Sequence, residues 1–147
     1  MSKNTARVAI LSAVKLVWPP DFGLLSVPNV NFTIPNNSRW GAVRINDNGT
    51  DRRSLGADYL KRSVGSLQFD LYAPSNTGTR ENTEASDFLE EFFDSRELLT
   101  SDDEMIVFQT PYSLDVSGVQ ERQDGTNSNW YRRIVDCPFY RDSHFIK

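Results

Sequence analysis

The sequence predicts an α+β fold in which a central, mainly antiparallel or mixed sheet of about five or six strands carries two main helices on one face. Two observations support this class. Between residues 63 and 72 apolar and polar side chains alternate, a period of two that is typical of a half-buried strand. From residue 79 the apolar side chains instead recur every three or four positions, as on one face of a helix. Because this strand and this helix can bury their apolar faces against each other, we place them at the centre of the fold.

The central strand and helix are separated by residues that stop a strand. Leu67, Phe69 and Leu71 form the apolar face of the strand. Pro74 lacks the N–H that a strand ladder needs and Gly78 tolerates a positive φ, so the strand ends in the turn that they bound. The helix that follows has one apolar stripe, formed by Ala85, Phe88, Leu89, Phe92 and Phe93.

A first helix is predicted near the N-terminus. Asn4 or Thr5 can cap it, and it runs to about Trp18, where a proline pair stops it. One face of this helix is apolar and is formed by Ala6, Ile10, Leu11, Val14, Val17 and Trp18. Val8 and Leu16 fall off this stripe. They either contact a second layer or a neighbouring subunit or are simply exposed, and scattered exposed apolar side chains are the commoner case.

The segment between the first helix and the central strand predicts two further strands. Residues Asp21–Pro28 form a connector, and Asn29–Ile34 is a short strand. A second strand, Trp40–Asn46, ends in a turn at Asp47–Gly49, because Asn-Gly is a strong hairpin signal. The polar and basic segment Thr50–Arg62 then forms either a long hairpin arm or a mobile loop.

The C-terminal part of the chain supplies the remaining strands. Arg96–Glu104 is an acidic connector, and the continuously apolar Met105–Phe108 is typical of a short interior strand. Leu114 and Val116 alternate with polar residues, and a turn leads into a strand at Trp130–Tyr140. On that last strand one face is expected to carry Tyr131, Val135, Cys137 and Phe139, and the other Trp130 and Ile134.

Composition limits the class of protein. The chain has 147 residues, of which 38% are hydrophobic, enough for one packed domain over residues 1–147. It contains one cysteine, Cys137, and one histidine, His144, so no disulfide framework or cysteine metal cluster is expected. The N-terminus has neither an apolar run of about 20 residues nor a signal-peptide pattern, which predicts a soluble protein of cytoplasmic origin with no membrane partner.

Charge is distributed unevenly along the chain. Residues 1–72 contain nine basic and five acidic side chains, whereas residues 73–147 contain seven basic and fifteen acidic ones. Within Glu81–Glu104 there are ten acidic side chains and a single basic one. This asymmetry predicts a surface with a basic and an acidic region.

Four features could be interpreted as catalytic or metal sites, and each has a simpler explanation. The acidic positions 87, 90, 91 and 94 of the second helix could hold a divalent ion, but they lie mainly opposite the apolar stripe, where a solvated face belongs. The run Asp102–Glu104 lacks the alternating ligands and the glycine of a calcium loop. No motif positions a nucleophile for His144, and Cys137 lies on the apolar side of a strand, as an inert thiol does. We therefore predict no catalytic residue, no metal ion and no cofactor.

A basic segment also has two interpretations. Its side chains could follow a phosphate backbone, with Trp40 and Tyr59 nearby as stacking groups. However, the sequence pI is about 5.0 and no nucleic-acid motif is present, so a protein partner with an acidic surface fits better. The segment consists of Arg39, Arg44, Arg52, Arg53, Lys61 and Arg62.

The order of these features resembles one family. A short helix is followed by a proline-punctuated segment, a tryptophan-led strand and a basic loop. The central strand and turn then show a spaced pattern of Gly65, Leu67, Tyr72, Pro74 and Gly78, and the next helix carries Ala85, Phe88 and Phe92. A last strand begins W-Y-R-R-I-V-D-C-P-F at Trp130. Over nearly its full length the chain resembles the tail terminator proteins of long-tailed, siphovirus-type bacteriophages.

The resemblance implies a structural virion protein with no enzymatic step and no cofactor. It implies a homo-oligomeric ring, usually of six copies, that caps the tail tube, terminates tail polymerisation and offers a docking surface to the head or neck. The implied partners are the tail-tube protein and a head-completion or neck protein, with genomic DNA only passing through the channel. The implied location is the head-proximal end of the virion tail, after assembly in the host cytoplasm. Two features depart from the family pattern: the longer segment Thr50–Arg62 and the strongly acidic second helix.

A cyclic ring needs two different patches that complement each other, and the charge asymmetry offers them. We predict that a basic set meets an acidic set of the next subunit: Arg44, Arg52, Arg53, Lys61 and Arg62 on one side, and Glu84, Asp87, Glu90, Glu91 and Asp94 on the other. Alternatively, the acidic helix or the run 102–104 faces the channel, where negative charge keeps DNA from adhering. The alternative functions are a head-closure, neck or tail-tube protein of the same virion, a small metal-dependent nuclease that uses the acidic helix, and a host-directed binding module.

Overall fold

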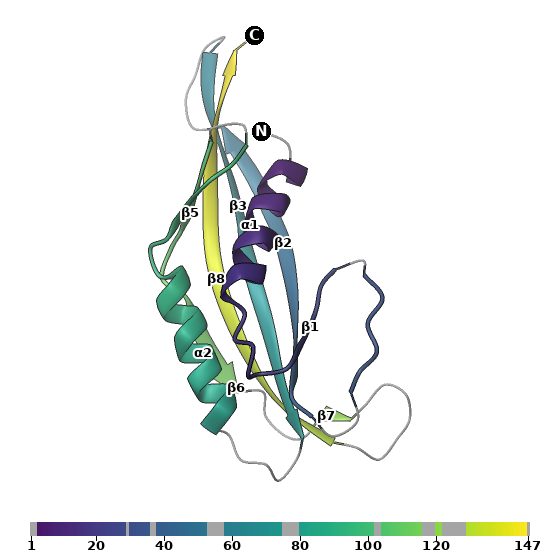
Figure 1. The fold of residues 1–147 in the computed structure, drawn as a ribbon. Coiled ribbons are helices and arrows are strands. Elements are labelled where there is room, and N and C mark those ends of the chain that lie inside the picture. Colours follow the sequence, from purple (N-terminus) through teal and green to yellow (C-terminus); the bar gives the residue numbers. More distant parts are fainter. Residues whose placement is uncertain are drawn as a thin grey trace.

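The computed structural model describes residues 3–28, 30–35, 38–52, 58–74, 80–101, 104–115, 120–121 and 129–146. Within these ranges the chain forms two helices and an eight-stranded sheet (Figure 1). In chain order the elements are α1 (Lys3–Val17), β1 (Leu24–Ser26), β2 (Trp40–Arg52), β3 (Asp58–Pro74), α2 (Arg80–Phe93), β4 (Glu97–Leu99), β5 (Met105–Phe108), β6 (Tyr112–Asp115), β7 (Gln120–Glu121) and β8 (Asn129–Ile146).

Three long strands, β2, β3 and β8, form the backbone of the sheet. The strand order is β1-β2-β3-β8-β5-β4, with β6 and β7 also paired to β8. Strand β3 therefore lies between β2 and β8, and its pairing with β8 runs in register from Asp58↔Ile146 to Pro74↔Trp130. The pairing of β1 with β2 is parallel and every other pairing is antiparallel. The predicted α+β class with a mainly antiparallel, mixed sheet is confirmed.

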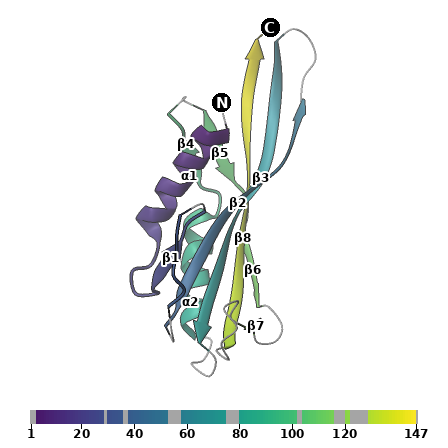
Figure 2. The same cartoon turned by 90° about the vertical axis from the view of Figure 1, so that its right-hand side faces the viewer.

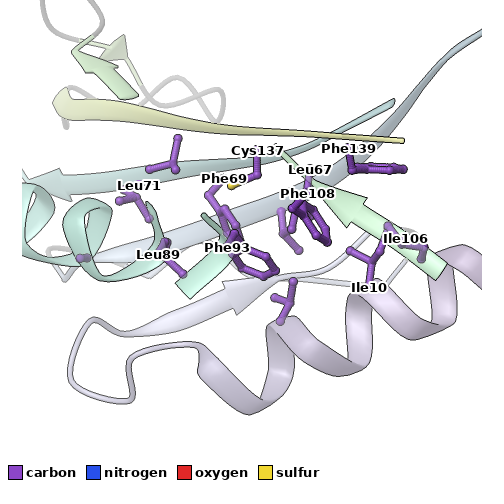
Figure 3. Close-up of a cluster of buried hydrophobic side chains, with 14 of the residues drawn as sticks. Ile10, Leu67, Phe69, Leu71, Leu89, Phe93, Ile106, Phe108, Cys137 and Phe139 are labelled. Carbon is purple, nitrogen blue, oxygen red and sulfur yellow. The ribbon is translucent and has the colours of Figure 1, made fainter. Parts of the chain in front are cut away.

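Both helices cover the same face of this sheet, as predicted (Figures 1 and 2). The alternation in β3 directs Leu67, Phe69 and Leu71 to that face, where all three are fully buried. Figure 3 shows the side chains that meet them there from α1, α2, β5 and β8. They include Ile10, Val14, Leu89, Phe93, Ile106, Phe108, Val135, Cys137 and Phe139.

The predicted helical stripes are confirmed except at one position. In α1 the buried side chains Ala6, Ile10 and Val14 follow the predicted face. In α2 the stripe buries Ala85, Leu89 and Phe93, and its remaining two members differ. Phe92 is partly buried against the core, whereas the ring of Phe88 is 48% exposed. Phe88 lies at the edge of the apolar stripe, on a side of α2 that does not face the sheet.

Several short strands differ from the prediction, because two or three residues are too few to show an alternation. The predicted strand Asn29–Ile34 is wrong: its described residues, 30–34, form no strand. The predicted connectors 21–28 and 96–104 instead contain β1 and β4, which pair with β2 and β5. These edge strands and β7 explain why the sheet has eight strands and not five or six.

The predicted turn at Asp47–Gly49 is also wrong. Strand β2 continues to Arg52, and a β-bulge interrupts its register with β3 between Asp47 and Gly49. Gly49 has φ +140°, a conformation that suits an irregular strand position and that other residues avoid. The Asn-Gly pair thus marks a bulge here and not a hairpin turn.

The segment Thr50–Arg62 forms a hairpin arm, one of its two predicted states. Its two strands continue β2 and β3, while residues 53–57 between them lie outside the described part of the chain. The C-terminal part of β8 pairs along the arm up to Ile146, so that the arm contains three strands. Figure 2 shows these strands extending beyond both helices. The described part of the chain includes no helix with the length and apolar character that a membrane span requires.

Candidate functional site

The acidic side of α2 is the most extensive charged surface that the sequence predicted. Asp87, Glu91 and Asp94 are exposed and Glu90 is half-buried. Together with Thr110 and Pro111 they line a shallow hollow of about 390 Å³ between α2 and the segment joining β5 to β6. Among the described residues, no ion pair neutralises these four carboxylates. They form an open negative surface on the β6 side of the helix.

The metal hypothesis for this surface has no support from the geometry. Within the described ranges, no three side chains of histidine, cysteine, aspartate or glutamate lie close enough to hold a metal ion. Asp94 accepts a hydrogen bond from the hydroxyl of Ser95 at 3.4 Å. Asp102, Asp103 and the side chain of His144 lie outside the described residues.

A second hollow lies on the other side of α2. It measures about 290 Å³ and is lined by Phe22, Ala85 and Phe88 among others. Its rim carries the ion pair between Arg39 and Glu81, whose nitrogen and oxygen are 3.6 Å apart. The remaining predicted acid, Glu84, also lies on this rim and accepts a hydrogen bond from Arg80 at 2.9 Å.

The predicted basic set is not one free patch. Arg62 donates two hydrogen bonds to Asp142, at 2.8 and 2.9 Å, and its guanidinium lies 4.1 Å from the centre of the Tyr140 ring. The hydrogen bond to Asp142 raises the pKa of Arg62. Arg44 is half-exposed and lies 3.8 Å from the carboxylate of Asp70. Both bases are therefore partly neutralised within their own chain.

The other three members of the basic set are only partly described. Lys61 is half-buried and has a partner within the chain. Arg52 pairs with Lys61 through the β2–β3 register, but its side chain and all of Arg53 lie outside the described part of the structure. The structure thus places four of the five predicted acidic side chains on one side of α2 and Glu84 on the other, and it distributes the described basic set along the arm and β2.

Sequence reasoning missed a charge cluster on the helix-free face of the sheet. Asp70 is 6% exposed and binds Arg132 at 3.1 Å, with Gln68 donating to the same carboxylate oxygen at 3.1 Å. These residues lie on β3 and β8, and Arg44 on β2 completes the cluster. The polar phase of β3 did predict Gln68 and Asp70 as outward-facing. Their partners depend on the strand order, which the local pattern does not contain.

A second polar cluster fixes α2 and β6 to β8. The guanidinium of Arg133 donates to Asp115, Ser113 and Ser86 at 2.7 to 2.8 Å. Tyr131 donates a short hydrogen bond to the same carboxylate of Asp115. The bonds from Tyr131 and then from Arg133 hold the pKa of Asp115 below its usual value. This cluster attaches the acidic helix rigidly to the sheet.

Cys137 is fully buried on the apolar face of β8, as predicted. Burial, and then the charges of Asp136 and Glu90, raise the pKa of its thiol far above the ordinary range. A thiol in this state is neutral and inaccessible, so it does not act as a nucleophile.

Comparisons with known proteins give a family match for the sequence and a structural match for the fold. A family model described as phage tail terminator protein matches residues 7–132. A search of curated proteins found no significant match. One solved protein structure superposes with a TM-score of 0.68 over 100% of this chain and 99% of its own length, at 15% sequence identity. At this identity the likeness shows a shared fold.

Proposed function

Because the chain belongs to the phage tail terminator family, a family of structural tail proteins and not of enzymes, we propose that it forms a ring that ends the growth of the tail tube. The ring contains six copies, caps the last tube ring, terminates tail polymerisation and provides the docking surface for the head. The family match over residues 7–132 is the observation that carries this proposal.

The architecture is compatible with a ring subunit. One face of the sheet is covered by helices and the other is not, so that each subunit has two distinct broad faces and two flanks (Figure 2). The acidic side of α2 lies on one flank, and the three-stranded arm projects beyond the body. Such an asymmetric subunit suits the heterologous contacts of a cyclic ring, in which two different patches meet.

The proposed partners follow from this position in the virion. The ring binds the tail-tube protein on one side and a head-completion or neck protein on the other, and genomic DNA passes only through its channel. It therefore lies at the head-proximal end of the tail, and it assembles in the host cytoplasm.

The proposal predicts that the protein stops tube growth. Purified protein added to polymerising tail-tube protein should halt elongation, because a bound ring covers the surface on which the next tube ring would assemble. Negative-stain electron microscopy would measure the tube lengths and show additional density at one end of each tube. Tube protein alone is the control. Incorporation of the chain along the tube would identify a tube subunit, and binding to heads without any effect on tubes would identify a neck protein.

The predicted contact between the basic and acidic sets remains part of this proposal. Reversing Arg52 and Arg53 to Glu should weaken ring formation at low ionic strength, because both side chains would then repel the acidic α2 of the neighbour. Native mass spectrometry would measure the fraction of rings. The matched control is Arg52→Lys with Arg53→Lys, which keeps both charges and should assemble normally. Rings that form as well with the Glu variant as with the Lys variant would remove the arm from the interface.

A further inference from the structure

The sheet has an open edge on each of its two sides. On one side, β1 pairs with β2 only from Trp40 to Ala42, and no other described strand pairs with that edge of β2. On the other side, β6 pairs with β8 through its inner edge, and within the described residues its outer edge has no strand partner. Figure 2 shows β1 and β6 at opposite sides of the sheet. The described part of each subunit therefore offers backbone N–H and C=O groups for pairing at two different places.

The two open stretches have the same length. The regular part of the β2 edge begins at Val43, because the preceding residue, Ala42, is the last one that pairs with β1. It ends at Asn46, because a β-bulge starts at Asp47 and a bulge bends its strand and interrupts the ladder. Strand β6, which runs from Tyr112 to Asp115, also has four residues. The two stretches can therefore pair along their whole lengths.

The directions of the two strands match as well. Strand β2 is antiparallel to β3, β3 is antiparallel to β8, and β6 is antiparallel to β8. Strand β6 therefore runs opposite to β2. Rotation about an axis along the strands keeps these directions from one copy to the next. Strand β6 of one copy then meets β2 of another as an antiparallel pair.

The faces of the two strands limit the register of such a pair. Side chains that lie directly opposite each other in an antiparallel pair share one face of the sheet. Tyr112 and Leu114 lie on the helix-free face, through their register with β8. Arg44 and Asn46 lie on the same face, through their register with β3. One register that uses all four residues of both strands sets Tyr112 opposite Asn46 and Leu114 opposite Arg44.

We propose that β6 pairs in this register with the Val43–Asn46 edge of β2 in the next copy of this chain, so that the sheet continues from subunit to subunit around the ring. The inference rests on the ring proposed above, and it names the backbone surfaces that hold the ring together. Because edge-to-edge pairing keeps the two faces of the sheet apart, the helices of all copies lie on one side of the ring wall.

The register suits a closed ring. Within one subunit, Tyr112 is level with Arg44, because the two positions are linked through β8 and β3. Pairing Tyr112 with Asn46 of the next copy therefore displaces neighbouring subunits by two residues along the strands. A sheet that closes on itself needs tilted strands and a stagger of this kind. The pairing also covers Tyr112 and Leu114, which are 53% and 48% exposed in the subunit.

The same pairing leads the arm to the acidic side of α2. Because the pair is antiparallel, β2 beyond Asn46 runs past Pro111 and Thr110 of the neighbour, the two residues that precede β6 closely in the chain. Both residues line the acidic hollow beside α2. The arm contact proposed above and the strand pairing are thus two parts of one interface.

The acidic hollow also favours a head-to-tail ring over a two-fold dimer. Two copies of β6 paired with each other would bring the acidic sides of two α2 helices close together, where like charges repel. Pairing β6 with β2 instead places each acidic side beside the arm of a neighbour, whose proposed contact residues are basic. Two different edges that meet in this way make a heterologous contact, which a cyclic ring requires.

A disulfide across the seam tests the register. In the double variant Asn46→Cys with Tyr112→Cys, mild oxidation of protein bound at tube ends should give a covalent ladder up to the full ring on non-reducing denaturing gels. Cβ atoms of directly opposite residues lie about 4.5–5.5 Å apart, close enough for a disulfide to form with a small adjustment. The native Cys137 is buried and does not compete.

Three controls accompany the double variant. Each single variant should give no disulfide, and an equal mixture of the two should give dimers as its main product. Val8→Cys with Tyr112→Cys should give no ladder, because Val8 is 57% exposed on α1, on the other face of the sheet. Dimers from Tyr112→Cys alone would indicate two copies of β6 paired across a two-fold axis and would overturn the proposal.

A pair of charged substitutions at Leu114 tests the seam without a cross-link. Leu114 is 48% exposed, so the subunit should tolerate both Lys and Glu there. Leu114→Lys should weaken subunit association by about two- to fivefold relative to Leu114→Glu, since like charges directly opposite each other destabilise a strand pair and Arg44 is the expected neighbour. Native mass spectrometry would measure the fraction of rings. Val8→Lys and Val8→Glu are the matched control and should assemble equally. Equal assembly of both Leu114 variants, or an equally large difference at Val8, would overturn the seam.

The two proposals fail in different ways. If tubes are capped by rings that give no disulfide ladder, the seam is wrong and the terminator function stands. If the wild-type protein neither forms rings nor stops tube growth, the proposed function is wrong and the seam falls with it.

Discussion

Phe93→Ala is expected to lower the free energy of unfolding by about 3–5 kcal/mol, because it removes a whole ring from the centre of the core. The Phe93 ring is fully buried. It lies 4.9 Å from the ring of Phe92, 5.0 Å from Phe108 and 5.9 Å from Phe69, measured between ring centres. It therefore joins α2, β5 and β3 at one point, as Figure 3 shows for its contacts with the latter two. Its removal leaves a cavity that rigid neighbours on several elements cannot fill.

The matched control is the same truncation five residues earlier on the same helix. Phe88 is 48% exposed, so Phe88→Ala loses little buried surface and should cost about 1 kcal/mol or less. Urea unfolding followed by circular dichroism would measure both variants, because truncation of a single ring leaves the slope of the unfolding curve unchanged. Equal costs for the two variants would mean that Phe88 is as buried as Phe93.

This pair also shows how far sequence periodicity reaches. The spacing of Ala85, Phe88, Leu89, Phe92 and Phe93 correctly predicts the helix and its buried face. A helical period assigns a face about 100° wide, but it does not say where the sheet beneath it ends. The exposure of Phe88 depends on that boundary, which is set by the position of α2 on β8 and β6. Periodicity thus identified the core and missed the one aromatic ring of this stripe that stands outside it.

Of the two charged sets, the sequence could predict where the acidic one lies, but not whether the side chains of the basic one are free. The acidic set lies within a single helix, so the grouping of Asp87, Glu90, Glu91 and Asp94 on one side of α2 followed from the helix alone. The basic set comes from different strands, and its state depends on long-range pairing. Arg62 meets Asp142 because β3 pairs with β8 across 80 positions of the chain, and Arg44 approaches Asp70 because β2 pairs with β3. No local pattern could have shown that these bases already have partners.

Strand β1, which the local sequence pattern did not predict, depends on a close backbone approach at Gly23. Gly23 has φ +126°, which L side chains rarely adopt, and a Cβ built on it would lie 2.0 Å from the carbonyl oxygen of Arg39. Its own carbonyl accepts a hydrogen bond from the indole of Trp18 at 2.9 Å. The next residue, Leu24, pairs with Trp40. This close approach is what lets a chain leaving α1 place β1 parallel to β2.

Gly23→Ala is accordingly expected to cost more than about 3 kcal/mol, because backbone strain of about 1–3 kcal/mol adds to a clash that the Arg39 backbone must relieve by moving. Gly49→Ala separates the two contributions. Gly49 has φ +140°, but no atom lies within 4 Å of the place that a Cβ would take, so the substitution there carries the strain without the clash. Urea unfolding of both variants gives the difference, which should be at least about 1 kcal/mol.

Hydrogen exchange at Leu25 and Ser26 should speed up selectively in Gly23→Ala, because the backbone shift separates β1 from β2. Equal costs and unchanged exchange would mean that the β1 connection tolerates a side chain, and that the flank beside α1 is less firmly placed than its contacts indicate.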